Sequence, residues 1–291
     1  MPTSPSRLIE RTTVAPGKEA LTIEAGGRPV RWLVLLPTGA TAGVHRPLAV
    51  ALHNFDGNAE GFADLIHADR LRARGVIVAL PQASGHAPDW KGPGLTLLAP
   101  ESGEEGGKVD DIVGVADGAA MLARVYDADP VDVNLIGFSQ GATLALAVTR
   151  RMDADHPAAV RRLFLAAGSI ATPPDATLAL RGTDLTAYEP GHNLPQTVAD
   201  WRNGEPSERE YLPALLKIKQ CAEIVHDKGS RLDRRDYACA DGSRVVHIFE
   251  AEGEHAWPGQ DAKYDSWLTG RGSTSALDFT NMIVGQIAPA P

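Results

Sequence analysis

The 291-residue sequence lacks the features that mark membrane proteins and nucleic-acid-binding proteins. It contains no run of about eighteen apolar residues, so we expect no transmembrane helix and no membrane partner. Basic residues are also in the minority, because 28 Lys and Arg stand against 37 Asp and Glu, which gives a formal net charge of -9. This surplus of negative charge argues against nucleic acid as a partner and mildly disfavours polyanionic substrates.

Two further features are scarce. Residues 1–20 have no apolar core of the kind found in signal peptides, so either the protein is cytoplasmic or a signal was removed before the numbering begins. Only two cysteines are present, Cys221 and Cys239, and their number alone does not separate these compartments. What the chain does have is apolar residues, 43% of the total, which are enough to bury a sizeable core.

Strand-like and helix-like segments alternate along the chain, which is typical of a largely parallel β-sheet flanked by helices. Short continuous apolar runs such as "LAVALH" and "GVIVAL" indicate strands that are buried on both faces. The expected strands are 20–25, 30–36, 48–52, 76–80, 131–136, 162–166, 177–180 and 244–250, and the expected helices are 59–72, 110–126, 140–152, 195–202, 208–225 and 275–286. Residues 1–19 are expected to form an extended N-terminal segment. No shift in composition marks a boundary, so residues 1–291 are interpreted as a single domain.

A serine lies between two glycines where a predicted strand becomes a predicted helix, in "NLIGFSQGATLALAV". Residues 137–141 fit the G-x-S-x-G nucleophile elbow, in which a sharp, strained turn exposes the serine oxygen at the carboxyl edge of a sheet. We therefore predict Ser139 as the nucleophile. The same turn would direct the backbone N–H of Gln140 toward an oxyanion formed on the substrate. The alternative is a glycine-flanked turn that contains an incidental serine.

A serine hydroxyl is a weak nucleophile near neutral pH, so it needs a general base that is oriented by a carboxylate. In the fold that carries this elbow, the chain order is Ser, then Asp or Glu, then His. His255 follows the last predicted strand in "EAEGEHAWPG", where a base that faces Ser139 is expected. His247 lies inside the strand pattern "RVVHIFEAE", and His226 lies at a polar helix end. His255 is therefore the predicted base.

Asp184 is the predicted carboxylate, because it comes just past a predicted strand end and lies between Ser139 and His255 in chain order. Its role would be to hold the tautomer of His255 and to stabilise the imidazolium. Glu189 and Asp200 are rivals. Asp200 falls in the helix-like run "QTVADWRN" and is expected on a solvated face.

The loop after the third core strand, in "LAVALHNFDGN", is expected to supply a second oxyanion donor. We assign this donor to the backbone N–H of Phe55, with Asn54 as the alternative, while an ordinary loop with a helix cap at Asn58 remains open. Asparagine tolerates a positive φ well, so a tight turn at Asn54 is compatible with the sequence.

Aromatic residues near the expected cleft are candidates for substrate contacts. Trp90 and Phe138 could pack against an aromatic acyl group or an alkyl polyester chain, although aromatic side chains serve equally well in a core. Trp257 is included as a candidate contact, but it fits better as a support for the loop that carries His255. Asn54 is a further candidate contact.

These motifs resemble those of α/β-hydrolase esterases, a family that includes polyhydroxybutyrate depolymerases, feruloyl esterases and acetylxylan esterases. The similarity covers most of the chain from about Val30 onward and includes "LHNFDGNAEGFAD" and "VIVALPQA" followed by Trp90. The most specific match is "GEHAWPG", which fits the G-x-H-x-W-P-G signature around the family's catalytic histidine. Two departures are Asn54 in place of glycine and an acid loop that is shortened to residues 182–184. "GFSQGA" is also similar to a carboxylesterase and acyl-thioesterase branch of the fold, but the Trp-Pro-Gly match favours the first group.

The resemblance implies an α/β-hydrolase fold with a mostly parallel sheet of about eight strands flanked by helices. It implies a serine esterase that forms an acyl-enzyme on a small or polymeric ester, such as feruloyl or acetyl esters or hydroxyalkanoate oligomers. The same triad could serve a peptidase or amidase, and a non-catalytic binding protein on a decayed scaffold is a further alternative. No cofactor or metal is expected, since His53, Asp56 and His67 lack the spacing of a zinc site.

The family often carries a disulfide between a cysteine after a helix and a cysteine before the last strand. Cys221 and Cys239 match that placement, so the resemblance implies that they are bridged. A bridge would favour a secreted or periplasmic location. Two unrelated buried thiols are the alternative.

Overall fold

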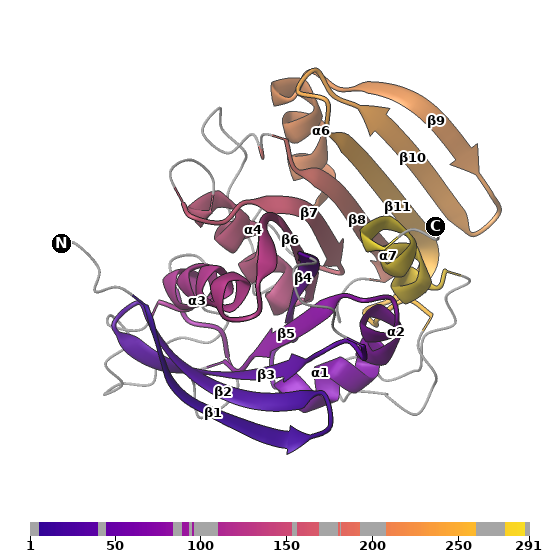
Figure 1. The fold of residues 1–291 in the computed structure, drawn as a ribbon. Helices are drawn as coiled ribbons and strands as arrows, with labels where there is room; N and C mark the ends of the chain where they lie inside the picture. The colour runs from indigo at the N-terminus through magenta and orange to yellow at the C-terminus, as the bar shows by residue number, and fades with distance from the viewer. Residues whose placement is uncertain are drawn as a thin grey trace, which may run out of the picture.

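The computed structural model describes residues 6–39, 45–83, 89–92, 95, 110–152, 156–168, 180, 182–192, 208–259 and 277–288. Within these residues, eleven strands form one sheet in the order β1-β2-β3-β5-β4-β6-β7-β8-β11-β10-β9 (Figure 1). The strands are β1 (Arg7–Ala15), β2 (Lys18–Ala25), β3 (Arg28–Leu35), β4 (Arg46–Leu52), β5 (Ile77–Pro81), β6 (Ala128–Phe138), β7 (Val160–Ala166), β8 (Asp184–His192), β9 (Ala222–Lys228), β10 (Leu232–Ala238) and β11 (Arg244–Glu254). The helices are α1 (Ala59–Leu65), α2 (Ala68–Ala73), α3 (Asp111–Val125), α4 (Gln140–Arg151), α6 (Glu208–Ile218) and α7 (Phe279–Ile287).

The centre of the sheet is parallel and both of its flanks are antiparallel. Strands β5, β4, β6, β7, β8 and β11 run parallel to one another. On one side, β1, β2 and β3 join β5 through antiparallel pairs, and on the other side β10 and β9 extend beyond β11. The parallel strands end at one edge of the sheet, so side chains that follow them are brought to the same edge.

Helices cover both faces of the sheet (Figure 1). One apolar cluster lies between the sheet and α3, α4 and α6, and the other lies between the sheet and α1, α2 and α7. Strand β4 shows how the sequence divides between them, because its side chains alternate between the two faces. Leu48, Val50 and Leu52 belong to the first cluster, whereas Ala49 and Ala51 belong to the second. The apolar run "LAVAL" is thus buried on both faces, as the sequence predicts.

Four observed strands, β1, β8, β9 and β10, lie outside the predicted strand ranges, and three of them lie toward the outer edges of the sheet. Every residue of β1 and of β9 is exposed, so neither strand carries the apolar signal from which strands are recognised in a sequence. Strand β1 occupies much of the expected extended segment 1–19 and pairs with β2. Charged side chains on β1 are typical of edge strands, where they oppose pairing with other molecules.

Several predicted elements need correction. The helix expected over 59–72 is divided into α1 and α2, because His67 between them has a positive φ of 47°. The helix expected over 208–225 ends at Ile218, and the chain then enters strand β9. His226 therefore lies on a strand rather than at a helix end. The expected helix 195–202 lies outside the described residues, as does the expected strand 177–180 except for Leu180.

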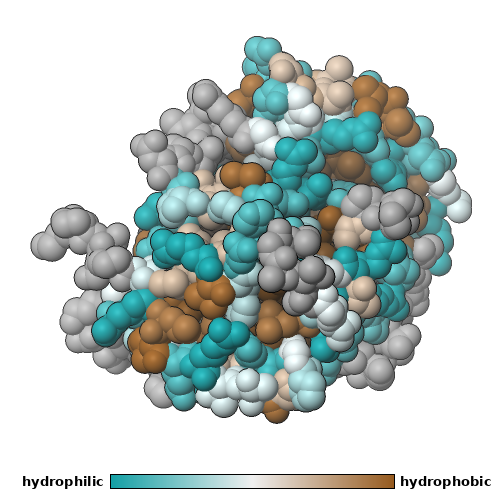
Figure 2. All heavy atoms as spheres, in the orientation of Figure 1, coloured by the Kyte–Doolittle hydropathy of each residue, from teal (hydrophilic) through white to brown (hydrophobic). Residues whose placement is uncertain are grey.

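Two features of the surface and termini complete the fold. On the face shown in Figure 2, hydrophilic residues are widespread among the coloured residues, and hydrophobic residues occur in several separated groups. Among the described helices, none is both long enough and apolar enough to span a membrane.

Asp110 caps α3, since its side chain accepts hydrogen bonds from the N–H groups of Ile112 and Val113.

The two cysteines form a disulfide, which confirms the expected pairing. Cys221 follows α6 and Cys239 follows β10, and 18 positions separate them in the sequence. A backbone hydrogen bond from Ala240 N–H to Lys219 O, 3.2 Å long, lies beside the bridge. The disulfide and this hydrogen bond together connect the end of α6 to the end of β10.

We predict that replacing both cysteines with serine will lower the free energy of unfolding by about 3 kcal/mol, because the bridge restricts the unfolded chain over a loop of this length. Urea denaturation of both proteins, with and without dithiothreitol, measures the effect. Dithiothreitol should destabilise only the protein that keeps the cysteines. Equal midpoints for all four samples would contradict the prediction.

Candidate active site

Ser139 lies at the sharp turn between β6 and α4. Its backbone has φ 55° and ψ -122°, a conformation that side-chain-bearing residues rarely adopt and that costs on the order of 1–3 kcal/mol. The Ser139 N–H donates a 2.9 Å hydrogen bond to Ala166 O at the end of β7. The turn is thus held against the neighbouring strand, and the strained serine lies at the carboxyl edge of the parallel strands.

The two glycines around Ser139 are required by close backbone contacts. A Cβ atom at Gly141 would lie 2.1 Å from Leu52 O and 2.5 Å from His53 O, at the end of β4. A Cβ atom at Gly137 would lie 2.4 Å from Gly141 O. No side chain fits at those distances, so the elbow expected from the G-x-S-x-G sequence is present in its physical detail.

His255 is in hydrogen-bond contact with Ser139. The distance from His255 Nε2 to Ser139 Oγ is 2.9 Å, and the two residues are only 4% and 9% exposed. His255 immediately follows β11, so the strand delivers it to the same edge of the sheet. The Phe138 ring lies against the imidazole, with 5.3 Å between ring centroids. The structure therefore brings together the predicted nucleophile and the predicted base, although 116 positions separate them in the sequence.

Asp184 is not brought to this site, and its placement corrects the sequence-based prediction. It is the first residue of β8 and pairs with Arg162 on β7, whereas Tyr188 of the same strand pairs with Ala166 at the level of the elbow. Four residues of strand span roughly 13 Å, so Asp184 lies near the opposite edge of the sheet. There its Oδ1 accepts a 2.9 Å hydrogen bond from Arg244 N–H.

The error arose from the position of a strand. The prediction placed a strand over 177–180, so that Asp184 followed its end, but Asp184 is the first residue of β8. Pro190 and Gly191 hide this strand in the sequence, because both residues are uncommon inside strands. Asp184 is therefore at the start of a parallel strand instead of at its end.

The two rival carboxylates are Glu189 and Asp200. Glu189 Oε2 lies 3.1 Å from Nε2 of His247, a residue of β11, so this glutamate is engaged with a different histidine. Asp200 lies outside the described residues. The chain leaves β8 at His192, which pairs with Glu254, the residue before His255.

The predicted oxyanion donors lie on the two segments that meet at Gly141. Gln140 is the first residue of α4, so its N–H has no acceptor within the helix. Phe55 lies in a turn that is closed by a 3.1 Å hydrogen bond from Gly57 N–H to Asn54 O. The positive φ expected at Asn54 is found instead at Asp56, with φ 60°. Asn58 caps α1 directly after this turn, as one of the sequence alternatives proposed.

The Gln140 side chain is hydrogen-bonded to the segment that contains Asp89, Trp90 and Leu95. Its amide nitrogen donates to the Asp89 carboxylate and to Leu95 O, the latter at 3.0 Å, and its oxygen accepts a 3.2 Å hydrogen bond from Trp90 N–H. Asp89 also forms a 2.9 Å ion pair with Lys91. Sequence analysis missed this buried network, because its members are far apart in the chain.

Trp90 is placed in the core, which corrects its prediction as a substrate contact. It is 0% exposed, and its indole N–H donates a 2.7 Å hydrogen bond to His53 O. Its ring also lies against the His53 ring, with centroids 4.5 Å apart. Trp90 thus fixes the segment that leads into the predicted oxyanion turn.

Trp257 is also buried in the core, next to Phe138. It is 0% exposed, its N–H donates to Thr280 Oγ1 at 3.0 Å, and its ring meets the edge of Phe138. This placement fits the interpretation as a support for the His255 loop and removes the role in substrate contact. Phe138 is mostly buried against His255, whereas Asn54 and Phe55 are partly exposed.

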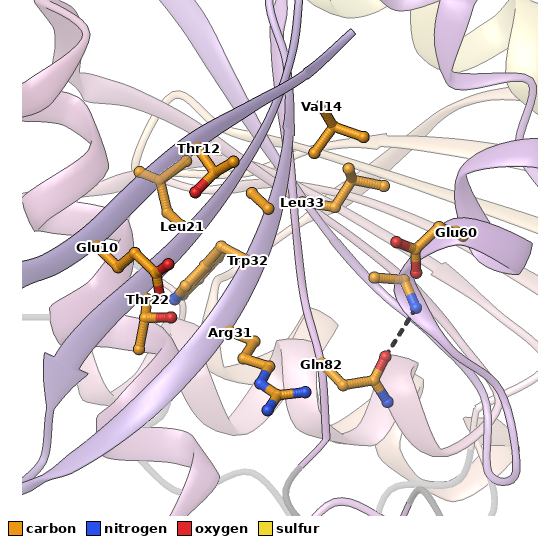
Figure 3. A pocket seen from close by; sticks show the side chains of 12 residues that line it. Glu10, Thr12, Val14, Leu21, Thr22, Arg31, Trp32, Leu33, Glu60 and Gln82 are labelled. Carbon is orange, nitrogen blue, oxygen red and sulfur yellow. Dashed lines mark hydrogen bonds between the residues drawn. The ribbon is translucent and has the colours of Figure 1, made fainter.

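Two cavities are lined by other parts of the molecule, and neither includes Ser139 or His255. The first, about 370 Å³, lies against β1, β2 and β3 and reaches the start of α1. Figure 3 shows Arg31 and Gln82 beside this cavity, and Gln82 Oε1 accepts a 3.1 Å hydrogen bond from Ala59 N–H. The second, about 350 Å³, lies between α6 and the β8–β11–β10 face and includes Glu189 and His247. Hydrogen-bond geometry, not cavity size, therefore identifies the candidate site.

Comparisons with solved structures establish the fold. An acetyl xylan esterase from Aspergillus awamori matches with TM-score 0.55 and 13% identity, over 84% of this chain and 93% of that chain. LpqC, a poly(3-hydroxybutyrate) depolymerase from Bordetella parapertussis, matches with TM-score 0.51 and 17% identity, over 70% and 79% of the two chains. No family model and no curated protein matches this sequence. The chain has the predicted α/β-hydrolase fold, with a larger sheet than expected.

His53 generates a prediction about pH and stability. Burial lowers its pKa from 6.5 to about 4, although a hydrogen bond to Asn54 O partly opposes the shift. A histidine whose pKa is lowered by folding stabilises the protein fully above its unfolded pKa. That stability is lost as the pH falls from about 6.5 through about 4, with a maximum of about 3 kcal/mol.

The free energy of unfolding in urea, measured from pH 7 to pH 4, tests this expectation. We expect His53→Gln to be less stable than the parent protein at pH 7 and to lose less stability on acidification. Parallel pH profiles for the two proteins would show that His53 does not cause the loss.

Proposed function

We propose that this protein is a serine hydrolase that cleaves carboxylic esters, with Ser139 as nucleophile and His255 as general base. The observation that carries the proposal is the 2.9 Å contact between Ser139 Oγ and His255 Nε2 in a nucleophile elbow. The likeness in fold to an acetyl xylan esterase and a poly(3-hydroxybutyrate) depolymerase supports an ester as the substrate.

In the first half of the reaction, Ser139 Oγ bonds to the carbonyl carbon while its proton passes to His255 Nε2. The carbonyl π electrons move onto oxygen, and the backbone N–H groups of Gln140 and Phe55 stabilise this oxyanion. Each donor of this kind lowers a barrier by roughly 3 kcal/mol. The bond from carbon to the alcohol oxygen then breaks, and His255 gives its proton to the leaving alcohol.

In the second half, a water molecule replaces the alcohol. His255 removes a proton from the water as its oxygen attacks the acyl carbon, and the bond from carbon to Ser139 Oγ breaks with return of the proton to that oxygen. The carboxylic acid is released and the enzyme is restored. The residues named here need no metal or organic cofactor for this sequence of steps.

The substrate class that we propose is an acetyl or feruloyl ester or a hydroxyalkanoate oligomer. A panel of acetylated xylan, methyl ferulate, hydroxybutyrate oligomers and p-nitrophenyl esters separates these possibilities, and matched ester and amide substrates test the amidase alternative. The bond between Cys221 and Cys239 supports a secreted or periplasmic location over a cytoplasmic one, because reducing compartments oppose disulfides.

We predict that Ser139→Ala will reduce kcat for p-nitrophenyl acetate by at least about 1,000-fold, since the nucleophile is removed while the fold is unchanged. The parent protein should also react covalently with a fluorophosphonate probe, and Ser139→Ala should not. Ser230→Ala, on the exposed turn between β9 and β10, is the matched control and should keep full activity. Full hydrolysis by Ser139→Ala would overturn the proposed mechanism.

A second prediction concerns the carboxylate. Because Asp200 lies between Ser139 and His255 in chain order, we propose Asp200 as the acid and expect Asp200→Asn to lower kcat by about 10³- to 10⁴-fold. Asp184→Asn should stay within about twofold of the parent protein, since Asp184 lies at the opposite edge of the sheet. Glu189→Gln completes the series. A folded Asp184→Asn protein that has lost activity would restore the original assignment.

A further inference from the structure

Glu250 is a carboxylate that is completely buried close to the candidate base. It is 0% exposed on β11, five positions before His255. The Tyr188 hydroxyl donates a 2.7 Å hydrogen bond to Glu250 Oε2. The second oxygen, Oε1, lies 3.5 Å from an Arg231 nitrogen and accepts no hydrogen bond from the part of the chain that the structure describes. The carboxylate is thus buried with incomplete compensation.

Stability alone does not explain a residue of this kind. Removing an ionisable group from water costs several kcal/mol, and apolar residues of similar size often replace buried ion pairs with no loss of stability. Arg231 compensates only partly, because its side chain is 41% exposed and its contact with Glu250 is long. We therefore look for a role of the hydrogen bond between Tyr188 and Glu250 in the geometry of β11, the strand that leads to His255.

The pair lies at an irregularity in the strand that leads to His255. Glu250 pairs with Pro190, and the next pair joins Glu254 to His192, so residues 251–253 face Gly191 alone. A strand that contains extra residues bends locally, and such bulges often direct a side chain at a functional site. Here the bend lies directly before the residue that contacts Ser139.

Tyr188 and Glu250 both lie against the backbone of this bulge. A Cβ atom at Gly253 would lie 2.6 Å from the Tyr188 hydroxyl and 3.1 Å from Glu250 Cβ, so the backbone at 253 rests directly on the pair. On the other side, a Cβ atom at Gly191 would lie 2.0 Å from Ala251 O. The bulge 251–253 is therefore in close contact with both Gly191 and the hydrogen-bonded pair.

We propose that Tyr188 and Glu250 are positioning residues that fix the bulge 251–253 and thereby hold His255 Nε2 at hydrogen-bond distance from Ser139. The inference rests on the proposed function and adds two residues to it. Neither residue touches the reacting atoms. A shift of the imidazole by about 1 Å is enough to reduce the rate of a reaction about 100-fold.

The main test is Tyr188→Phe, which removes one oxygen atom and keeps the ring that packs near Phe279. We expect kcat for p-nitrophenyl acetate to fall about 10- to 100-fold with little change in KM, because alignment of His255 is lost and substrate contacts are not. The rate of labelling by a fluorophosphonate probe should fall in parallel. Tyr237→Phe, on β10, is the matched control and should leave both rates unchanged.

Variants at Glu250 separate positioning from simple packing. Glu250→Gln keeps an oxygen that accepts the Tyr188 hydrogen bond and should retain most of the parent kcat. Glu250→Leu removes the acceptor and should resemble Tyr188→Phe. Rates are compared at a temperature where circular dichroism shows each variant to be folded, so a loss of stability alone does not count as support.

The outcomes distinguish the two levels of the proposal. If the parent protein hydrolyses no ester and does not label at Ser139, the proposed function fails. If the parent protein is active and folded Tyr188→Phe and Glu250→Leu keep kcat and labelling rates within about twofold, the positioning role is overturned. An equal loss in Tyr237→Phe also overturns it, because the effect would then not be specific to this pair.

Discussion

The contact between the start of α4 and the end of β4 is the constraint on which the site depends. Gly141 lies so close to Leu52 O and His53 O that no Cβ atom fits between them. This contact fixes the helix start, and with it the strained backbone of Ser139 and the direction of the Gln140 N–H. It also brings the segment that leads into the turn at Phe55 to the start of α4, because His53 is two residues before Phe55. One backbone approach thus sets three of the features that the proposed reaction needs.

Buried polar groups keep the segments around this contact in place. Gln140, on the helix, reaches Asp89, which pairs with Lys91, and Lys91 N–H donates a 2.7 Å hydrogen bond to Asp111 at the start of α3. Asp111 in turn forms an ion pair with Arg28 on β3. Such networks specify a unique arrangement when their members are satisfied. The network therefore connects the nucleophile elbow to the antiparallel side of the sheet.

Sequence reasoning succeeded where a local pattern carries the physical constraint. The glycines at 137 and 141, the apolar run of β4 and the histidine after β11 are each visible in a few neighbouring residues. It failed where the signal is nonlocal or hidden. Strand β8 contains Pro190 and Gly191, and the helix–strand change after Ile218 has no apolar alternation because β9 is exposed throughout. Asp184 was misplaced because Pro190 and Gly191 hide strand β8 in the sequence. The Tyr188–Glu250 pair depends on the register between β8 and β11, which the sequence does not state.

The two histidines at this edge of the sheet show how partners decide chemical roles. His53 uses both ring nitrogens on the backbone, since Ala83 N–H donates to Nε2 at 3.2 Å and Nδ1 lies 2.8 Å from Asn54 O. Nε2 must then be the acceptor and Nδ1 the donor, which is the neutral tautomer, in agreement with a pKa lowered to about 4. This imidazole has no nitrogen left for a substrate. His255 instead directs Nε2 at a hydroxyl, the one partner here that can give up its proton to a base and later regain it. Both residues are buried histidines, but their partners differ. His53 faces backbone groups and serves the scaffold, whereas His255 faces the Ser139 hydroxyl, which is the contact that the proposed reaction uses.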